Sequence, residues 1–426
     1  MKRVVEIGLA ALAASLAVMS AATADEVTPS AQTDMQDVRG QSVMDRPRPG
    51  YDAAGIHAGS FMVYPKADVS ESYNDNIYAT DSSTKSDFIT MVSPSVTVNS
   101  LWSRHALNFG GGIDKFWYAD NTGEDRLDWH VSADGRLDIL HDTNIVASAA
   151  YAQLHEDRAL PTSASSTAEP TKYKLFTSSL AFNHAFNRVT TSLAGSWNRY
   201  NYDDVPLIGG GVLDQDYRDR DEYTESAKLG YLLSPDTNVY LRGTLNQRKY
   251  NDQPPVVAVT RDSKGYQVVV GSDFKLSRLM EGGVYVGYQH QTYDEPSFSD
   301  DSGVAYGANV NWFVTPLTTV RLNADSTIEE SVIAGNSSYL AQSVGLGLDH
   351  ELLRNVIISG DVGYENDDFK GISRKDDIYS GALGVKYLLN PNFALGLEYR
   401  IIDRSSNIGT NDYTRNVVGL TLRGQL

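Results

Sequence analysis

A dense group of acidic side chains in the stretch DQDYRDRDE is the part of this sequence best suited to bind a metal ion. Calcium takes about six to eight oxygen ligands, and carboxylates close together on one loop can supply them. Arg218 and Arg220 interrupt the series, and its spacing does not fit an EF-hand loop. We therefore expect a solvated acidic loop and no resident metal. The carboxylates concerned are those of Asp214, Asp216, Asp219, Asp221 and Glu222.

Catalytic motifs are missing from the sequence. There is no Gly-x-Ser-x-Gly and no His-Glu-x-x-His, and Gly209-Gly210-Gly211 is not followed by the Lys of a phosphate-binding loop. The neighbouring pairs Asp300-Asp301 and Asp367-Asp368 fall in predicted loops, where nothing fixes two carboxylates across a cleft as glycoside hydrolysis requires. The eight histidines are scattered without metal-ligand spacing. We expect no enzymatic activity, no catalytic residue and no cofactor.

The N-terminus has the pattern of a secretory signal peptide. Lys2 and Arg3 precede an apolar run from 7 to 19, and Ala22-Thr23-Ala24 forms a small-x-small site, which predicts cleavage after Ala24. The chain has no cysteine, which excludes a small disulfide-bonded domain. Its formal charge of −18 argues against a nucleic-acid partner. Elsewhere no run approaches the roughly 18 apolar residues of a transmembrane helix, so a membrane form would have to be a barrel.

Short alternations of apolar and polar side chains fill the rest of the chain. Residues 126–138, 239–248 and 319–325 each place apolar side chains on one parity and charged or amide side chains on the other. This period of two predicts strands with one apolar and one polar face. The last segment, 416–426, has the same pattern, with Val418, Leu420, Leu422 and Leu426 on its apolar face.

The connections between these segments alternate between short turns and long polar stretches. Such a two-ended arrangement is typical of bacterial transmembrane barrels, which have tight periplasmic turns and longer extracellular loops. We predict an all-β, antiparallel, up-and-down barrel of about eighteen strands over residues 61–426, closed by 416–426. Eight short turns support this count; they are centred on residues 102–104, 141–143, 187–188, 235–237, 278–280, 316–317, 353–354 and 391–392.

A soluble sandwich, propeller or β-helix would show the same alternation. The signal peptide and the loop asymmetry favour the membrane. Aromatic residues near strand ends also favour it, because membrane barrels carry aromatic girdles at both interfaces. The girdle candidates are Trp117, Tyr118, Tyr200, Tyr202, Tyr231, Tyr288, Trp312 and Tyr387.

Residues 25–60 differ from the barrel segment. They are polar at first, and Pro47 and Pro49 then hold the backbone extended. We expect a partly disordered periplasmic segment, with a plug or a docking strand for a periplasmic partner as the alternative.

From about Val43 onward the sequence resembles a family of Gram-negative outer-membrane barrels, the putative β-barrel porin 2 family. The resemblance lies in VMDRPRPGYDAAGIHAGSFMVYPKADVSESYNDNIYAT and DFITMVSPSVTVNSLWSRHAL, where the Arg-Pro, Tyr-Asp and Gly-Ile elements and then the Asp75-Asn76 pair are the more specific features. It implies an outer-membrane location, contact with lipid and lipopolysaccharide, and insertion by the barrel assembly machinery. Members are often met in exopolysaccharide or capsule gene sets, which implies polysaccharide export with a periplasmic export protein as a partner.

A barrel of this size is wide enough for an aqueous channel unless loops fill it. Its predicted polar face carries both signs of charge, which suits hydroxyl-rich solutes better than ions of one sign. We therefore predict a pore for exopolysaccharide export; a general or substrate-preferring diffusion porin and a non-conducting surface scaffold are the alternatives. The pore-lining candidates are Arg126, Asp128, Asp134, Arg136, Lys228, Arg242, Arg248, Asp273, Lys275, Arg321, Asp325, Asp361, Glu398, Arg400 and Arg423.

Overall fold

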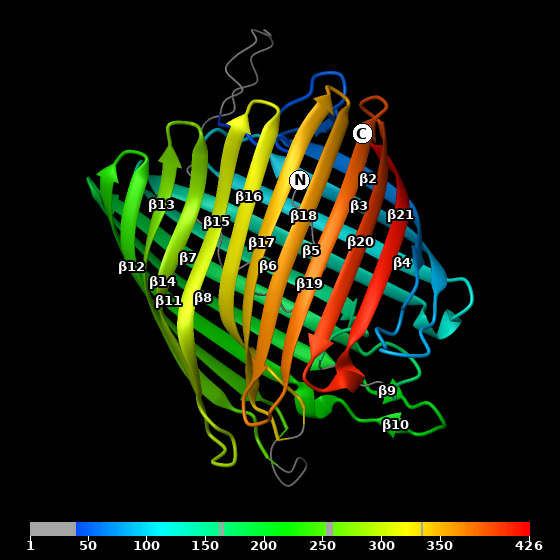
Figure 1. Ribbon diagram of the computed structural model, residues 1–426. Helices are drawn as coiled ribbons and strands as arrows, with labels where there is room; N and C mark the ends of the chain where they lie inside the picture. Colours follow the sequence, from blue (N-terminus) through cyan, green and yellow to red (C-terminus); the bar gives the residue numbers. More distant parts are fainter. Residues whose placement is uncertain (1–39, 162, 164–165, 253–258, 334) are drawn as a thin grey trace.

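The computed structural model describes residues 40–426 except 162, 164–165, 253–258 and 334. The predicted signal peptide, its cleavage at Ala24 and residues 25–39 lie outside the described residues. Long tilted strands form a continuous wall that closes on itself (Figure 1). Short turns join the strands at the upper end of this view, which we call the turn end, and longer loops join them at the lower end, which we call the loop end.

Eighteen antiparallel strands build the wall, as the sequence predicted. They are β2 (Phe61–Asn74), β3 (Asp87–Ser100), β4 (Ala106–Tyr118), β5 (Arg126–Leu140), β6 (Thr143–His155), β7 (Lys172–Phe186), β8 (Val189–Tyr202), β11 (Arg220–Ser234), β12 (Thr237–Tyr250), β13 (Ser263–Leu276), β14 (Met280–Tyr293), β15 (Asp301–Thr315), β16 (Thr318–Glu330), β17 (Ser338–Leu353), β18 (Val356–Phe369), β19 (Lys375–Leu388), β20 (Phe393–Ser406) and β21 (Tyr413–Gln425).

The barrel closes where its last strand pairs with its first. β21 pairs with β2 from Lys66↔Gln425 to Asn74↔Val417. Nearer the turn end, a short strand, β1 (Ile56–Ala58), pairs with the first residues of β2, on the edge that β21 occupies farther along. An ion pair from Arg423 to Asp68, with both Nε and Nη2 at 2.8 Å, joins the two strands on the inner face.

The Asp75-Asn76 pair fastens the loop end of this seam. The Asp75 carboxylate accepts hydrogen bonds of 2.7 Å from the backbone N–H and the side-chain amide of Asn416. The Asn76 amide donates to the carbonyl oxygens of Thr80 and Thr414, at 2.8 and 3.0 Å. The pair therefore anchors the first loop to the closing strand.

Connections at the two ends differ in length. Those at the turn end span two to five residues and coincide with the eight predicted turns, whereas those at the loop end span five to seventeen. The loops contain three 3-10 helices, η1 (Thr122–Glu124), η2 (Asp216–Arg218) and η3 (Gly409–Asn411), and a small hairpin of β9 (Val205–Pro206) and β10 (Val212–Leu213). Residues 209–211 turn this hairpin with φ of 94°, 102° and 95°, a backbone region that favours glycine. Within the described part of the chain, no helix is long and apolar enough to cross a membrane.

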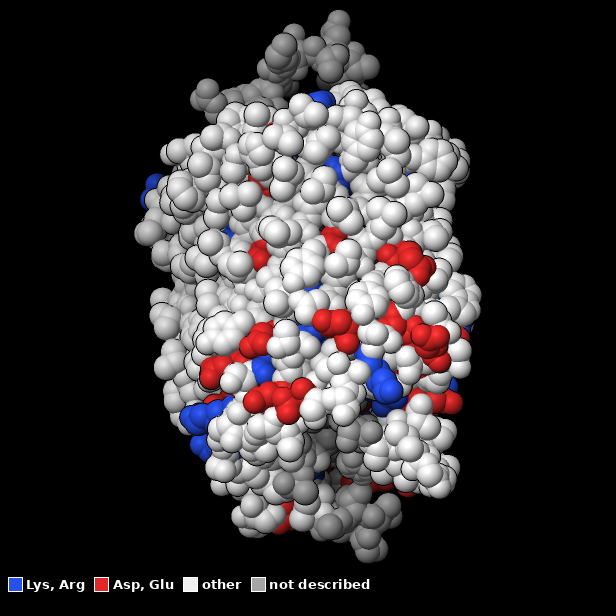
Figure 2. Space-filling model, turned by 45° about the vertical axis from the view of Figure 1, so that its right-hand side comes forward, with Lys and Arg blue, Asp and Glu red and all other residues white. Residues whose placement is uncertain are grey.

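The outer face of the wall is apolar and exposed. Leu420 on β21, Leu383 on β19 and Val362 on β18 keep 55%, 64% and 62% of their surface accessible. Figure 2 shows a largely uncharged upper surface, with acidic and basic side chains gathered toward the loop end. A soluble protein would bury such a face, so its exposure in a closed barrel indicates a surface made for lipid.

Of the eight predicted girdle residues, five face outward, as a girdle requires, and three do not. Trp117, Tyr231, Tyr288, Trp312 and Tyr387 are exposed on the outer face. Tyr118, Tyr200 and Tyr202 stand on the opposite parity of β4 and β8 and are buried inside the barrel. Sequence position near a strand end does not determine the face, because a shift of one residue reverses it.

Two predicted loop carboxylate pairs also need correction. Asp367 and Asp368 lie within β18, and Asp301 begins β15. Both strands extend farther toward the loop end than the polar composition of these stretches suggested.

We expect Asp68→Ala to lower the free energy of unfolding by about 2 kcal/mol, because it removes a charge-assisted contact at the seam and leaves Arg423 without its partner there. The measurement is the urea midpoint of the heat-modifiable folded band in lipid vesicles. Asp138→Ala is the matched control, because its carboxylate pairs with Arg136 on the same strand. Equal shifts for the two variants would contradict a special role for the seam.

Candidate functional site

The inner face of the barrel is the candidate functional site. Each of the fifteen predicted pore-lining residues has the strand parity opposite to the exposed apolar side chains; they are Arg126, Asp128, Asp134, Arg136, Lys228, Arg242, Arg248, Asp273, Lys275, Arg321, Asp325, Asp361, Glu398, Arg400 and Arg423. Their role in permeation stays a prediction.

Several charges on this face are paired with a residue of another strand, and others pair with the next inward-facing residue of their own strand. Arg321 donates to Asp349 at 2.9 Å and to Asp361 at 2.7 Å. Lys228 reaches Asp273 at 2.6 Å, across the strand between them. Asp349 was not among the predicted lining residues, because its partnership with Arg321 depends on the register of β16 against β17.

The middle of the inner face remains accessible. Asn309, Asn323 and Asp325 are exposed although they point away from the lipid-facing side of β15 and β16. Glu398 keeps 47% of its side chain exposed while it pairs with Arg400 at 2.7 Å. The polar middle zone of the barrel therefore borders solvent-accessible space.

At the loop end, the connection between β6 and β7 reaches across the barrel. We call its described residues within 156–171 the inner loop. Arg158 donates to Glu124 in the neighbouring loop at 2.6 Å, and this Glu is 2% exposed. The backbone oxygen of Ala159 accepts a 2.9 Å bond from Arg404 of β20, and Asp157 pairs with Arg415 of β21 at 3.1 Å. The inner loop is thus tied to strands that follow it by more than 240 residues.

Tyrosine and arginine side chains pack beside the inner loop. Tyr173 stacks on Tyr202 with ring centroids 5.1 Å apart, and the Arg218 guanidinium lies 4.0 Å from the Tyr202 centroid. Arg218 also binds the carboxylate of Glu156 in the inner loop. These rings are buried, so the loop end of the lumen is narrowed by packed side chains.

A second element narrows the loop end from the opposite side. The ends of β16 and β17 and the connection between them, residues 326–340 as far as described, turn inward from the wall; we call them the inturned tip. Glu330 of this tip binds Arg248 and Tyr250 of β12, and its backbone at Ile328 accepts from Arg248 at 2.9 Å. Arg248, a predicted pore-lining residue, therefore holds the tip and is largely covered by it.

At the turn end, the start of the described chain occupies the mouth of the barrel. The Val43 N–H donates to Thr319 Oγ1 at 3.0 Å, and Val43 is fully buried. Arg46 and Arg48 both donate to Glu351 of β17, at 2.8 and 3.1 Å, with all three side chains about 5% exposed or less. This position is compatible with the plug alternative for the N-terminal segment.

The carboxylates of the acidic stretch 214–222 fall into two groups in the structure. Asp219 accepts from Asn201 and Tyr202, and Asp221 accepts from Trp197 and Arg199, so both are occupied by the protein. Asp214 and Asp216 group instead with Asp204, all three exposed. Asp204 Oδ1 and Asp214 Oδ1 accept backbone N–H groups of the same loop, as turn-forming aspartates do.

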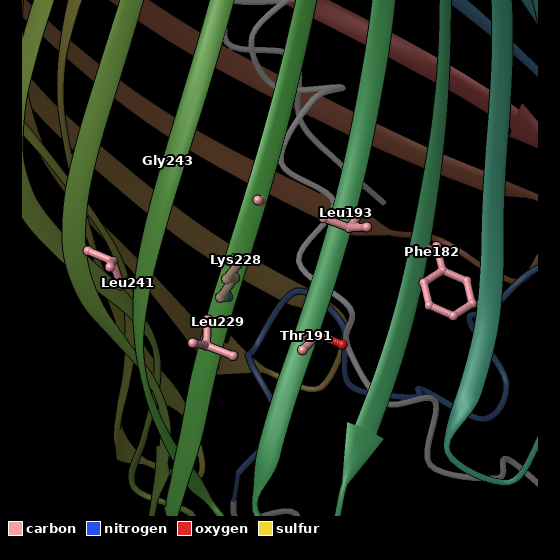
Figure 3. Close-up of a pocket in the computed structure, with 8 residues that line it drawn as sticks. Phe182, Thr191, Leu193, Lys228, Leu229, Leu241 and Gly243 are labelled. Atoms are coloured by element: carbon pink, nitrogen blue, oxygen red, sulfur yellow. The ribbon is translucent and has the colours of Figure 1, made fainter.

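A depression of about 400 Å³ lies on the outer face over β7, β8, β11 and β12 (Figure 3). Leu193, Leu229 and Leu241 border it and are more than half exposed. Lys228 contributes from the other side of the wall, where it binds Asp273. The depression suits the acyl chains around a membrane barrel rather than a hydrophilic solute.

Comparison with known families identifies the architecture. A family model described as putative beta-barrel porin 2 matches residues 48–426. The chain belongs to this family. No curated protein matches it.

Solved outer-membrane barrels are similar to this porin-family chain at low identity. The siderophore receptor PirA from Pseudomonas aeruginosa is 8% identical, with 85% of this chain and 80% of that chain covered and a TM-score of 0.46. The outer membrane protein OpdK from the same species is 10% identical, with 85% and 98% covered and a TM-score of 0.42. The siderophore receptor PiuA from Acinetobacter baumannii is 9% identical, with 87% and 82% covered and a TM-score of 0.43.

We predict that the Asp157–Arg415 anchor of the inner loop holds from pH 7 to 5 and is lost as the pH falls below about 4. Burial opposes ionisation of Asp157, but the Arg415 charge and the Ala159 N–H outweigh it, so the pKa of this carboxyl is lowered. A lowered pKa gives stability that is complete above the ordinary Asp value and is lost as the pH falls through the folded value.

Hydrogen exchange at the Ala159 amide, corrected for its intrinsic rate, measures this detachment. Asp157→Asn should exchange fast already at pH 7, with no further step in acid. A step of equal size in that variant would show that another group controls the loop.

Glu351→Ala should release the N-terminal segment from the turn end. The substitution leaves Arg46 and Arg48 buried without their shared counter-ion, a loss of about 3–5 kcal/mol that a short segment cannot sustain. Protection of the Val43 amide should fall, while the control Glu398→Ala, which breaks only the exposed pair with Arg400, should leave it unchanged. Unaltered protection in Glu351→Ala would contradict this anchoring.

Proposed function

We propose that this protein is an outer-membrane pore that takes part in the export of an exopolysaccharide. The observation that carries the proposal is the water-accessible polar zone in the middle of the barrel, lined by Asn309, Asn323, Asp325, Glu398 and Arg400. A closed barrel of eighteen strands is wide enough for such a zone to continue as a channel. The outer membrane is the location that its apolar outer face and its family support.

The character of this wall supports a hydroxyl-rich cargo. Pairing such as that of Arg321 with Asp349 and Asp361 removes rings of one charge, which ion-selective pores need. What stays exposed is a mixture of amides and oppositely charged groups. These groups exchange hydrogen bonds with hydroxyls without holding any one of them strongly.

Both ends of the barrel carry covering segments, and this supports a pore that opens on demand. The N-terminal segment lies in the turn end, and the inner loop and inturned tip lie in the loop end. Barrels of this type place their short turns in the periplasm. A periplasmic polysaccharide-export protein, the partner implied by the family resemblance, would then meet the N-terminal segment first.

Insertion of the barrel into the outer membrane would depend on the barrel assembly machinery. The acidic loops at the loop end would face lipopolysaccharide.

A diffusion porin, general or substrate-preferring, is the second candidate, because the accessible middle zone would also serve small solutes. A non-conducting scaffold is the third, and the covering segments at both ends are equally compatible with it.

Deletion of the gene separates the first two candidates. We expect loss of surface polysaccharide with unchanged uptake of small solutes, and complementation by the intact gene should restore the polysaccharide. Impaired small-solute uptake with normal polysaccharide would favour the diffusion porin instead. Planar-bilayer recording addresses the scaffold. Current steps support a pore. Their absence in the intact protein and in a variant that combines Glu351→Ala with Asp157→Asn and Glu330→Gln, which loosens all three covering segments, supports a closed barrel.

A further inference from the structure

The wall of the barrel is split at the loop end between β15 and β16. Their pairing runs from Thr315↔Thr318 to Gly307↔Asp325 and stops there. β15 nevertheless continues to Asp301, paired with β14, and β16 continues to Glu330, paired with β17. Residues 301–306 and 326–330 are therefore both in strand conformation without being paired to each other, and the two strands diverge toward the lower end of Figure 1.

Beyond the split, the inturned tip lies against the inner surface of the wall. The Gln289 amide of β14 donates to the backbone oxygen and hydroxyl of Ser326, at 3.1 and 3.2 Å. Leu340 covers Gly303 of β15 so closely that a Cβ there would stand 3.0 Å from its side chain. Ser326 and Ile328 share the parity of Val320 and Leu322, which face lipid, yet they are 1% and 5% exposed. The tip thus packs its own outer face on the inner face of β14 and β15.

Polar contacts hold the tip in this position. Glu330 accepts from Arg248 and from the hydroxyls of Tyr250 and Tyr293, the latter two at 2.9 and 3.3 Å. The Ser338 hydroxyl donates to Asp301 at 2.9 Å, and Arg261 donates to the backbone of Ser331 and Asn336. Each of these contacts joins a side chain to another side chain or to a single backbone oxygen, so none of them is strand pairing.

The edge of β15 that faces β16 matches the tip in register and in pattern. It carries no backbone pairing to β16 over residues 301–306, although the Val304 carbonyl accepts a side-chain hydrogen bond from the Ser326 hydroxyl at 2.8 Å. Extending the pairing beyond Gly307↔Asp325 places Ser326 opposite Tyr306 and Ile328 opposite Val304. Val304 is 55% exposed on the outer face, so an apolar Ile328 beside it would suit lipid. Thr327 and Glu329 would then face inward, as polar residues do elsewhere in the wall. An unpaired strand edge of this kind is a template for another strand.

We propose that the inturned tip is a displaceable gate, which exchanges its polar contacts with β12, β14 and β15 for backbone pairing with residues 301–306. In the paired position it completes the wall and leaves the lumen. The evidence for the exchange is the split and the register of β15 against β16. Its effect on permeation rests on the proposed pore function.

Engineered disulfides test the exchange, because the chain has no cysteine of its own. Asp301→Cys with Ser338→Cys joins the tip to its present position. Val304→Cys with Ile328→Cys joins the paired position; at present the sheet separates these two, since Val304 points outward and Ile328 lies inside. Val310→Cys with Leu322→Cys, paired in both states, controls for cross-linking efficiency. Heat-modifiable migration verifies folding of each variant.

We expect both test pairs to cross-link under mild oxidation, as read by mass spectrometry. Glu330→Gln should speed the Val304–Ile328 cross-link by about tenfold or more, the factor that loss of one charge-assisted hydrogen bond provides. Bilayer conductance should be low in the 301–338 cross-linked form, high in the 304–328 form, and equal in both after reduction.

Failure of the 304–328 pair to cross-link, even with Glu330→Gln, while the 310–322 control does so, would falsify the exchange. Equal conductance in the two cross-linked forms would overturn the gate. Cross-linking of the 304–328 pair without current in any form would support the exchange and overturn the pore function, so the two failures are distinguishable.

Discussion

The pairing of the last strand with the first is the constraint on which this structure depends. A strand in a membrane must satisfy its backbone groups through its neighbours, and only closure removes both edges. The seam joins residues 355 positions apart, as the Arg423–Asp68 ion pair shows, so it forms only when every intervening hairpin is in register. Once it is closed, each side chain of a wall strand points either toward the lipid or toward the lumen. The Asp75-Asn76 pair, which carries part of the family resemblance, acts at this seam rather than at a ligand site.

Closure also determines how the interior accommodates charge. Polar residues that alternate with apolar ones all point into one confined space, where isolated charges would be costly. Ion pairs between strands neutralise part of this charge, as Arg321 does with Asp349 and Asp361. Beside the inner loop, a tyrosine ring packs against a guanidinium group. The covering segments are anchored at the two ends and leave side chains in the middle zone accessible.

The β15–β16 split is where the structure departs from an ideal barrel. Backbone pairing between the two strands stops there, and side-chain contacts of the inturned tip take its place. The tip keeps the alternation of a wall strand while it packs against the inside of the wall. The proposed exchange would give this one segment two alternative positions, as a bistable element requires.

The sequence by itself determined the alternation, the eight turns, the strand number and the inward parity of the charged residues, because these depend on local periodicity and turn composition. Only the tertiary structure decided that Tyr118, Tyr200 and Tyr202 face inward, that Asp367 lies in a strand, and that Arg248 binds Glu330. Asp204 likewise joins Asp214 and Asp216 only through loop folding. Each of these depends on register or on contacts between distant strands, and closure of the barrel settles both at once.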